Sequence, residues 1–337
     1  MNWYLENGKE SDVVNYSKVE LKRNVEGYPF SHKMTEEQRK KFLESVKYIT
    51  PSLGFHLQYF SMKDIDDITK RVLIEKNLIP YYFARRKEDT AILINDEENI
   101  CVLVGGEEHL IIQVFVPGLD LQNAMYLAKE IDEKIQQQLN FSYHEKYGYL
   151  TANPMSCGTG LRGYTVLHLP GLKISNNLSK MINIIQNFGM IVTNEYDEDI
   201  EENENIYKIT NHQTMGITEE TIIKNIENIT KRVIEQERIA RKYLGKNEVQ
   251  LADKVYRSYG ILINAKKISY KEVEQLLSDV KLGTDLGIIL ELNDTKVKKM
   301  LLYAKEANLL KKEGKVYNRE EIEIKRAELM KQIARRK

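Results

Sequence analysis

The sequence predicts an α+β fold, in which an antiparallel sheet flanked by helices is followed by a small all-helical domain. Two observations lead to this class. Short β-branched segments separated by tight turns occupy residues 90–115, and helical repeats of apolar residues follow them. No strand pattern appears after about residue 245. We therefore expect a sheet domain over residues 1–245 and a helical domain over residues 246–337.

Composition excludes several function classes. The 337 residues leave room for about two domains, and 50 Lys+Arg balance 50 Asp+Glu. A net charge of zero removes the simplest argument for nucleic-acid binding. Cys101 and Cys157, the two cysteines, cannot build a disulfide framework. With no signal-peptide pattern and no long apolar run, we expect a cytoplasmic protein that binds neither nucleic acid nor membrane.

The first ninety residues read mainly as helix. Thr35 and Gln38 have the spacing of a capping box, which predicts a helix to about Tyr48. A second helix is predicted from about residue 61 to residue 76.

Strands begin near residue 90. Segments 90–96, 99–104 and 109–115 are β-branched, and the turns between them are too short for parallel crossovers. They must therefore be antiparallel neighbours. Apolar residues then recur every three to four positions over residues 121–135, which predicts an amphipathic helix that covers the sheet.

The rest of the chain contains further strands and then only helices. Thr218 opens a helix whose apolar stripe is more typical of a core than of an interface. In the tail, Ser269 has the spacing of a second capping box, Gly283 is predicted to end a helix, and a last helix begins near Arg319. The additional strands are predicted at residues 147–151, 164–169, 189–193 and 205–211.

Several blocks resemble the ATP:guanido phosphotransferases, in particular the bacterial protein arginine kinases. They include LIEKNLI at 73–79, EEHLIIQ at 107–113, YGYLT at 147–151 and GTGLR at 158–162. Their order and spacing follow the family over nearly the whole chain. The resemblance implies an antiparallel sheet with flanking helices, then a helical domain that makes a homodimer. It also implies ATP and Mg²⁺ as cofactors and protein arginine side chains as substrates.

Most arginines that bind the nucleotide phosphates in this family are replaced. Lys18 and Glu20 stand at the first two of these positions, and Ile111 and Thr193 at two others. Arg162 matches the family unchanged, so the resemblance assigns nucleotide binding to Arg162 and Lys18. Charge-assisted contacts contribute roughly 1.5–3 kcal/mol each, so these replacements predict weak nucleotide binding.

The guanidinium side of the family site is better kept. Glu107 matches the catalytic base, Glu198 matches the second catalytic glutamate, and Glu108 stands where the family has a substrate-binding aspartate. The preceding Asn-Glu pair of the family is Gly105-Gly106 here, and the reactive cysteine is Asn153. Without the resemblance, 105–108 is most simply a polar turn, and the acidic run around Glu198 a solvated loop.

In the tail, the phosphoarginine receptor pair of the family aligns with Ile322 and Glu323. We predict no resident metal site from the residues themselves. The resemblance implies partners in bacterial protein quality control: an activating zinc-binding protein, an AAA+ unfoldase–protease and a stress-gene repressor. A noncatalytic protein on this scaffold would also be expected to pair with an active kinase homologue.

Two classes of function stay open. One is an active protein arginine kinase. The other, which we favour, is a catalytically impaired protein that binds arginine side chains as a regulatory partner. The preference rests on the loss of the cations that phosphoryl transfer requires.

Overall fold

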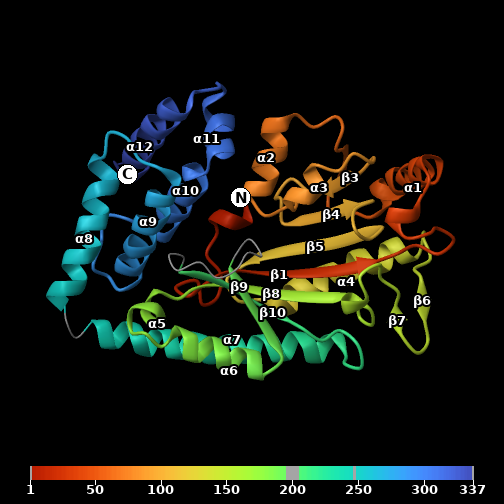
Figure 1. Cartoon of the computed structure of the whole chain (residues 1–337), viewed down its shortest axis with the longest axis horizontal. Helices are drawn as coiled ribbons and strands as arrows, with labels where there is room; N and C mark the ends of the chain where they lie inside the picture. The colour runs from red at the N-terminus through yellow and green to blue at the C-terminus, as the bar shows by residue number, and fades with distance from the viewer. Residues whose placement is uncertain (1, 195–204, 246–247, 336–337) are drawn as a thin grey trace.

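An eight-stranded antiparallel sheet forms the centre of the computed structural model, which describes residues 2–194, 205–245 and 248–335 (Figure 1). Its strands lie in the order β2-β3-β4-β5-β1-β8-β10-β9. The predicted α+β class is therefore confirmed. The strands are β1 (Val14–Arg23), β2 (Gln58–Ser61), β3 (Ala91–Ile94), β4 (Ile100–Val104), β5 (Leu110–Pro117), β8 (Leu161–His168), β9 (Met190–Asn194) and β10 (Ile206–Asn211), and a separate hairpin contains β6 (Tyr143–His144) and β7 (Gly148–Tyr149).

The three strands predicted between residues 90 and 115 are adjacent and antiparallel, as expected. Ile92 pairs with Leu103 across β3 and β4, and Leu103 pairs with Ile111 across β4 and β5. The short turns between these strands left no other pairing, because a parallel crossover needs a dozen or more residues.

The prediction that the first ninety residues are mainly helical is wrong for β1 and β2. β1 lies at the centre of the sheet between β5 and β8. Its partners are about 90 and about 145 residues away in sequence, so no local turn signals the pairing. The second predicted helix also starts later: residues 58–61 form β2, and α2 (Asp67–Glu75) begins after the N-cap Asp66.

Helices cover one face of the sheet and part of the other. α1 (Glu36–Ile49), with its predicted capping box, and α4 (Leu121–Gln136) and α7 (Glu219–Leu244) pack on the first face around the main core. The apolar stripe of α7 belongs to this core, as predicted. On the opposite face, α2 and α3 (Tyr81–Ala84) enclose a second apolar cluster. Two short helices, α5 (Pro170–Ile174) and α6 (Leu178–Asn187), follow β8.

The C-terminal helices form their own core beside the sheet (Figure 1). That this helical unit is an independent domain from residue 246 stays a prediction. Its helices are α8 (Glu248–Asn264), α9 (Tyr270–Asp285), α10 (Asp294–Ala304), α11 (Glu306–Glu313) and α12 (Arg319–Arg335).

Gly283 does not end a helix, contrary to the prediction. It lies inside α9, which continues to Asp285, and the left-handed residue after the helix is Gly287, with a φ of 71°. A Cβ on Gly283 would lie 2.2 Å from Cγ1 of Val255 on α8. Glycine is therefore needed here for close helix packing rather than for chain reversal.

The change Gly283→Ala is expected to destabilise the protein by about 1–3 kcal/mol, because the added methyl group overpacks the α8–α9 contact. Gly260 in α8 is a matched control, since a Cβ there would meet nothing within 4 Å. Gly260→Ala should stabilise the protein by roughly 0.5–1 kcal/mol through helix propensity. Chemical denaturation of both variants measures the difference, and equal stabilities would contradict the packing argument.

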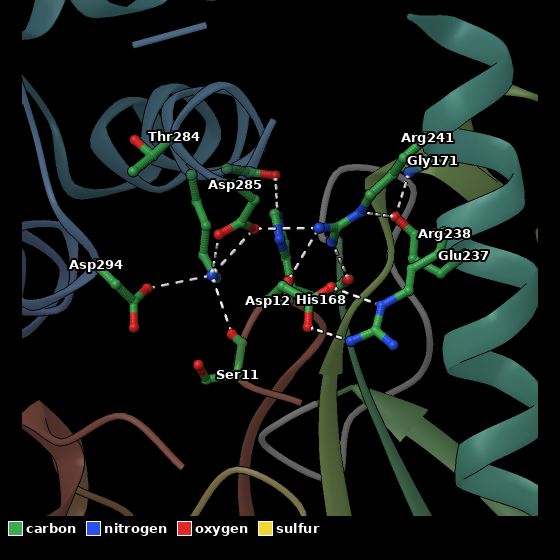
Figure 2. A network of polar contacts seen from close by, with 12 residues as sticks. Ser11, Asp12, His168, Gly171, Glu237, Arg238, Arg241, Thr284, Asp285 and Asp294 are labelled. Atoms are coloured by element: carbon green, nitrogen blue, oxygen red, sulfur yellow. Dashed lines mark hydrogen bonds and ion pairs between the residues drawn. The ribbon is translucent and has the colours of Figure 1, made fainter. Parts of the chain in front are cut away.

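Arg241 of α7 links the sheet to the helical unit (Figure 2). Its side chain is buried and donates to the carboxylate of Glu237 at 2.6 Å and to that of Asp285 on α9 at 3.1 Å. It also donates to the backbone carbonyls of Asp12 and His168, each at 3.0 Å. One guanidinium thus joins the N-terminal segment, β8, α7 and α9.

Lys281 extends this network on the helical side. Its ammonium donates to Asp285 at 3.1 Å, to Asp294 of α10 at 3.2 Å and to the carbonyl of Ser11 at 3.3 Å. The contacts of Arg241 and Lys281 to Asp285 form one continuous group of charges. Removal of Arg241 would leave the buried carboxylate of Glu237 without its counter-ion, whereas Asp285 is shared between the two cations.

Replacing Arg241 with Met should lower the free energy of unfolding by about 3–5 kcal/mol, since breaking a buried ion pair leaves an uncompensated charge. Arg238, three residues earlier, pairs with Glu10 and Asp12 but is largely exposed. Its change to Met should cost at most about 1 kcal/mol. Urea denaturation measures the free energy of unfolding of both variants. A larger decrease for Arg238→Met than for Arg241→Met would contradict the importance assigned to the buried Arg241 network.

Candidate functional site

Charged residues of β1 line the face of the sheet opposite α4. Lys18, Glu20 and Lys22 alternate with Val19 and Leu21, whose side chains are fully buried in the main core. Successive residues of a strand point to opposite faces, so the three charged side chains lie in a row on the other face. Among the described elements, α2 and α3 cover the β3–β5 half of that face.

Glu20 is the centre of this row. Its carboxylate lies 2.5 Å from the ammonium of Lys18 and accepts a hydrogen bond of 2.9 Å from the hydroxyl of Tyr164. Burial alone would raise the pKa of Glu20, but the charges of Lys18 and Lys22 outweigh it and hold the pKa below its ordinary value. Glu20 is therefore a carboxylate at neutral pH and acts as counter-ion to both lysines.

Arg162 shares this face. It is the direct cross-strand partner of Glu20 on β8, and its Nη1 donates to the carbonyl of Asn211 at 2.5 Å. Directly paired residues of antiparallel strands point to the same side. The two residues predicted to bind nucleotide, Lys18 and Arg162, thus lie on adjacent strands of one face.

Lysines lie opposite Ile111 and Thr193, the two other positions at which the resemblance predicts a replaced arginine. Lys22 is the cross-strand partner of Ile111, and Lys208 is that of Thr193. The sequence did not single out Lys22 or Lys208, because only the pairing of their strands with β5 and β9 places them opposite Ile111 and Thr193. Recognition of the polar–apolar alternation of β1 would have pointed to Lys22.

Glu107 lies in a cleft beside the charged row. Its side chain is 40% exposed, and Lys22 Nζ approaches it to 3.5 Å. The cleft has a volume of about 460 Å³, and Tyr82 and Arg86 line it together with Glu107. A Cβ on the neighbouring Gly106 would lie 3.0 Å from the ring of Phe83. The absence of a side chain at Gly106 lets the backbone approach α3 closely. Compared with the Asn-Glu pair that the resemblance predicts here, the Gly105-Gly106 pair also lacks a carboxylate.

Tyr82 adds a neutral aromatic group to this cleft. Burial and the nearby charges of Glu107 and Glu20 raise the pKa of its phenol. The phenol therefore keeps its proton at neutral pH. The cleft combines a partly exposed carboxylate with an aromatic ring, two groups that attract a planar cation.

Glu108 is fully buried behind the cleft. Its carboxylate accepts hydrogen bonds from the side chain of Asn24 at 2.6 Å and from the backbone N–H groups of Ala152 and Asn153 at 2.8 and 3.3 Å. These contacts join the end of β1 to the loop after β7. Its predicted role in substrate binding stays a prediction, as does the catalytic role of Glu107.

Glu198 lies outside the described residues, so its predicted role also stays a prediction. His109 and Cys101 have structural roles in the described part of the chain. His109 accepts from the backbone N–H of Val25 at 2.9 Å, and Cys101 is buried in β4, where burial raises the pKa of its thiol to about 12.

Within residues 2–194, 205–245 and 248–335, no cluster of three or more His, Cys, Asp or Glu side chains is arranged to hold a metal ion. In the same ranges, no helix has both the length and the apolar character needed to cross a bilayer.

The sheet and its flanking helices define the phosphagen-kinase fold. A duplicated taurocyamine kinase from Schistosoma mansoni, with bound transition-state-analogue components, superposes with a TM-score of 0.63 at 19% identity. The match covers 72% of this chain and 37% of that enzyme, so the chain spans little more than a third of it. A lombricine kinase gives a TM-score of 0.60 at 16% identity, covering 69% of this chain and 68% of that one.

The chain belongs to the ATP:guanido phosphotransferase family. The profile of the family's C-terminal catalytic domain matches residues 34–240, and that of the protein-arginine kinase McsB C-terminal domain matches residues 248–336. A protein-arginine kinase of Halothermothrix orenii is 38% identical over 98% of this chain and 95% of its own length. That of Caldanaerobacter subterraneus subsp. tengcongensis is 39% identical over 95% and 96%. These relatives confirm the resemblance seen in the sequence.

The change Glu20→Gln is expected to tighten binding of inorganic triphosphate roughly tenfold, because Lys18 and Lys22 lose a competing carboxylate. Glu26, an exposed glutamate six residues further on, supplies the control Glu26→Gln with the same change in charge. Calorimetric titration measures both. An unchanged affinity in Glu20→Gln would show that Glu20 does not limit anion binding.

The change Glu20→Gln should also alter the free energy of unfolding, by an amount that depends on pH. Since the folded-state pKa of Glu20 is lowered, its carboxylate stabilises the fold above the ordinary glutamate pKa of about 4.3, and this contribution is lost as pH falls through the lower folded value. Glu20→Gln should therefore be less stable than the wild type at pH 7, and the difference should shrink in acid.

Proposed function

We propose that this chain is a catalytically impaired relative of the protein-arginine kinases that binds arginine side chains of proteins as a regulatory partner. Family membership supports the choice of ligand. The single observation that supports impairment is Glu20, an ionised carboxylate paired with Lys18 on the face where the resemblance places the nucleotide phosphates.

The charge balance of this face supports weak nucleotide binding. Phosphoryl transfer depends on cations that neutralise the phosphates and the charge developing in the transition state. Here a triphosphate would compete with Glu20 for Lys18, and the cross-strand cations opposite Ile111 and Thr193 are lysines. A lysine is a point charge without the planar fork with which arginine grips phosphate oxygens.

The residues present fit ATP and Mg²⁺ only in part. Lys18, Lys22 and Arg162 have the charge to hold phosphates, and bound Mg-ATP would supply the γ-phosphoryl group. The Gly105-Gly106 pair offers no side-chain oxygen to a metal ion. Magnesium would therefore depend on the phosphates themselves and on Glu107.

The arginine side of the site is more complete. A carboxylate can accept two parallel N–H bonds from a guanidinium, and Glu107 is exposed enough to do so. The ring of Tyr82 in the same cleft offers a cation–π contact. Glu198 is proposed as the second carboxylate that contacts the guanidinium. Glu108 is proposed to support substrate binding indirectly, because its carboxylate holds the loop at Ala152 and Asn153.

An active protein arginine kinase is the second candidate. The observation that favours it is the cross-strand placement of Lys22 and Lys208, which restores positive charge beside two of the replaced arginines. In this case the lysines take over phosphate binding and Glu107 acts as the base toward the guanidinium.

The remaining partner assignments belong to this proposal. An active kinase homologue, an AAA+ unfoldase and a stress-gene repressor are the candidates, in the bacterial cytoplasm, with homodimerisation through the helical tail. Ile322, at a position of the family's phosphoarginine receptor, is buried against Leu309 and Leu310. A hydrocarbon side chain cannot bind phosphate, so any regulation by phosphoarginine would need other residues.

Titration with a denatured, arginine-rich protein tests arginine binding, with a lysine-rich protein of equal charge as the control ligand. We expect saturable binding of the first, weakened at least tenfold by Glu107→Gln and unaffected by Glu26→Gln. Equal binding of the two ligands would overturn arginine recognition.

Calorimetry with Mg-ATP separates the two candidates. The impaired protein should bind it at millimolar concentration or more weakly. Micromolar binding, together with phosphoarginine on the denatured substrate that disappears in Glu107→Gln, would establish the active kinase instead.

A further inference from the structure

The cleft of Glu107 contains a cation as well as a carboxylate. Arg86 lines it together with Glu107 and Tyr82. In the proposed function, Glu107 and Tyr82 contact an arginine side chain, whereas Arg86 has no assigned part. The cleft thus offers a ligand one guanidinium beside one carboxylate.

The charge of Arg86 is only weakly compensated. Within residues 2–194, 205–245 and 248–335, its one ion pair is with Glu88, whose carboxylate lies 3.5 Å from Nε and is 52% exposed. An ion pair with an exposed partner contributes little to stability, so a ligand can replace Glu88 at low cost. Because Nε is buried, the ligand would contact the terminal Nη groups.

Arg39 adds a second positive charge near Arg86. Its buried side chain donates to the backbone carbonyls of Gly105 at 3.0 Å and Ser31 at 2.5 Å. Burial, followed by the charge of Arg86, lowers the pKa of Arg39, and nearby acidic groups offset this only in part. An anion bound at Arg86 would therefore reduce the repulsion between two neighbouring guanidinium groups.

A substrate arginine that enters this cleft alone meets opposing charges. Glu107 and the ring of Tyr82 attract its guanidinium, whereas Arg86 repels it. A carboxylate next to that arginine on the substrate chain would pair with Arg86 and so replace a repulsion with an attraction. The cleft therefore favours a ligand that carries a guanidinium and a carboxylate close together.

Phosphate is the other anion that a guanidinium binds well, but the acidic groups of this cleft disfavour it. The charges of Glu107 and of Glu20 both raise the pKa of Tyr82, so two carboxylates act on this space. A phosphate carries roughly two negative charges and would be repelled by both of them. A ligand that contains arginine brings a positive charge together with its carboxylate.

We propose that Arg86 is a specificity-determining residue, which makes the cleft prefer arginine side chains that have an acidic residue next to them in the protein chain. This preference rests on the proposed function, in which the arginine itself binds at Glu107. Arg86 would hold the neighbouring carboxylate through its planar fork of N–H donors.

Two unstructured peptides of identical composition test the preference. Each contains one arginine and two aspartates. In one peptide the aspartates flank the arginine, and in the other they lie at the two ends, beyond a Debye length of about 8 Å. Calorimetric titration of the full-length protein should show roughly five- to tenfold tighter binding of the flanked peptide, because one charge-assisted contact is added. Equal affinity for the two peptides would overturn the preference.

A third peptide, with lysine in place of the arginine in the flanked sequence, separates this preference from the proposed function. Binding of the lysine peptide as tight as that of its arginine counterpart would overturn arginine recognition, and the preference with it. No saturable binding by either arginine peptide would have the same meaning. If both arginine peptides bind equally and more tightly than the lysine peptide, the preference alone is overturned.

Arg86→Gln should lower the affinity for the flanked peptide to that for the other arginine peptide. Arg85→Gln is the matched control and should keep the preference. Arg85 is exposed, its guanidinium lies over the ring of Tyr81 at 4.4 Å, and it is not one of the described residues that line the cleft. A preference that persists in Arg86→Gln, or that is lost equally in Arg85→Gln, would overturn the proposal.

Inorganic triphosphate tests the alternative role of Arg86. Its affinity should be similar in the wild type and in Arg86→Gln. Weaker triphosphate binding with unchanged peptide binding would assign Arg86 to the nucleotide and overturn the proposal. If Arg86→Gln does not fold, Arg86→Lys keeps the charge but loses the planar fork, and it should reduce the preference at least about twofold. An unreduced preference in that variant would count against the contact with Arg86.

Discussion

The alternation of side chains along β1 is the constraint on which the rest of the structure depends. β1 is paired on both edges, so its register is set by β5 and β8 together. A slip of one residue would turn Val19 and Leu21 out of the core and bury Lys18, Glu20 and Lys22 in their place. The hydrophobic core and the charged row are therefore fixed by the same register of β1, and a shift in that register would move both sets of side chains.

Charge pairing on this row serves stability and limits binding at the same time. Glu20 compensates two lysines that would otherwise repel each other beside a partly buried sheet face. The same compensation lowers the attraction of the face for phosphate. An active phosphagen kinase needs uncompensated cations there, so stability of the empty site and affinity for nucleotide oppose each other in this chain.

Sequence patterns predicted those parts of the fold whose signals are local. The strands β3, β4 and β5 are joined by tight turns, and α1 carries its capping box within four residues, so both were predicted correctly. β1 was missed because its partners are distant in sequence. Gly283 was misassigned because glycine is common both at helix ends and at close helix contacts, and only the position of Val255 distinguishes the two.

The sequence by itself determined the family. Through the resemblance it also predicted that Glu20, Ile111 and Thr193 replace family arginines and that Glu107 is retained, because these predictions depend on residue identity and order alone. Only the tertiary structure decided that Glu20 is paired with Lys18, and that Lys22 and Lys208 lie opposite Ile111 and Thr193. It likewise decided that an apolar cavity lies between the sheet and the helical tail. The physical reason is that strand pairing and side-chain alternation set which side chains meet. Ile111 faces Lys22 from another strand, Thr193 faces Lys208 in the same way, and Glu20 lies beside Lys18 because both project from one face of β1.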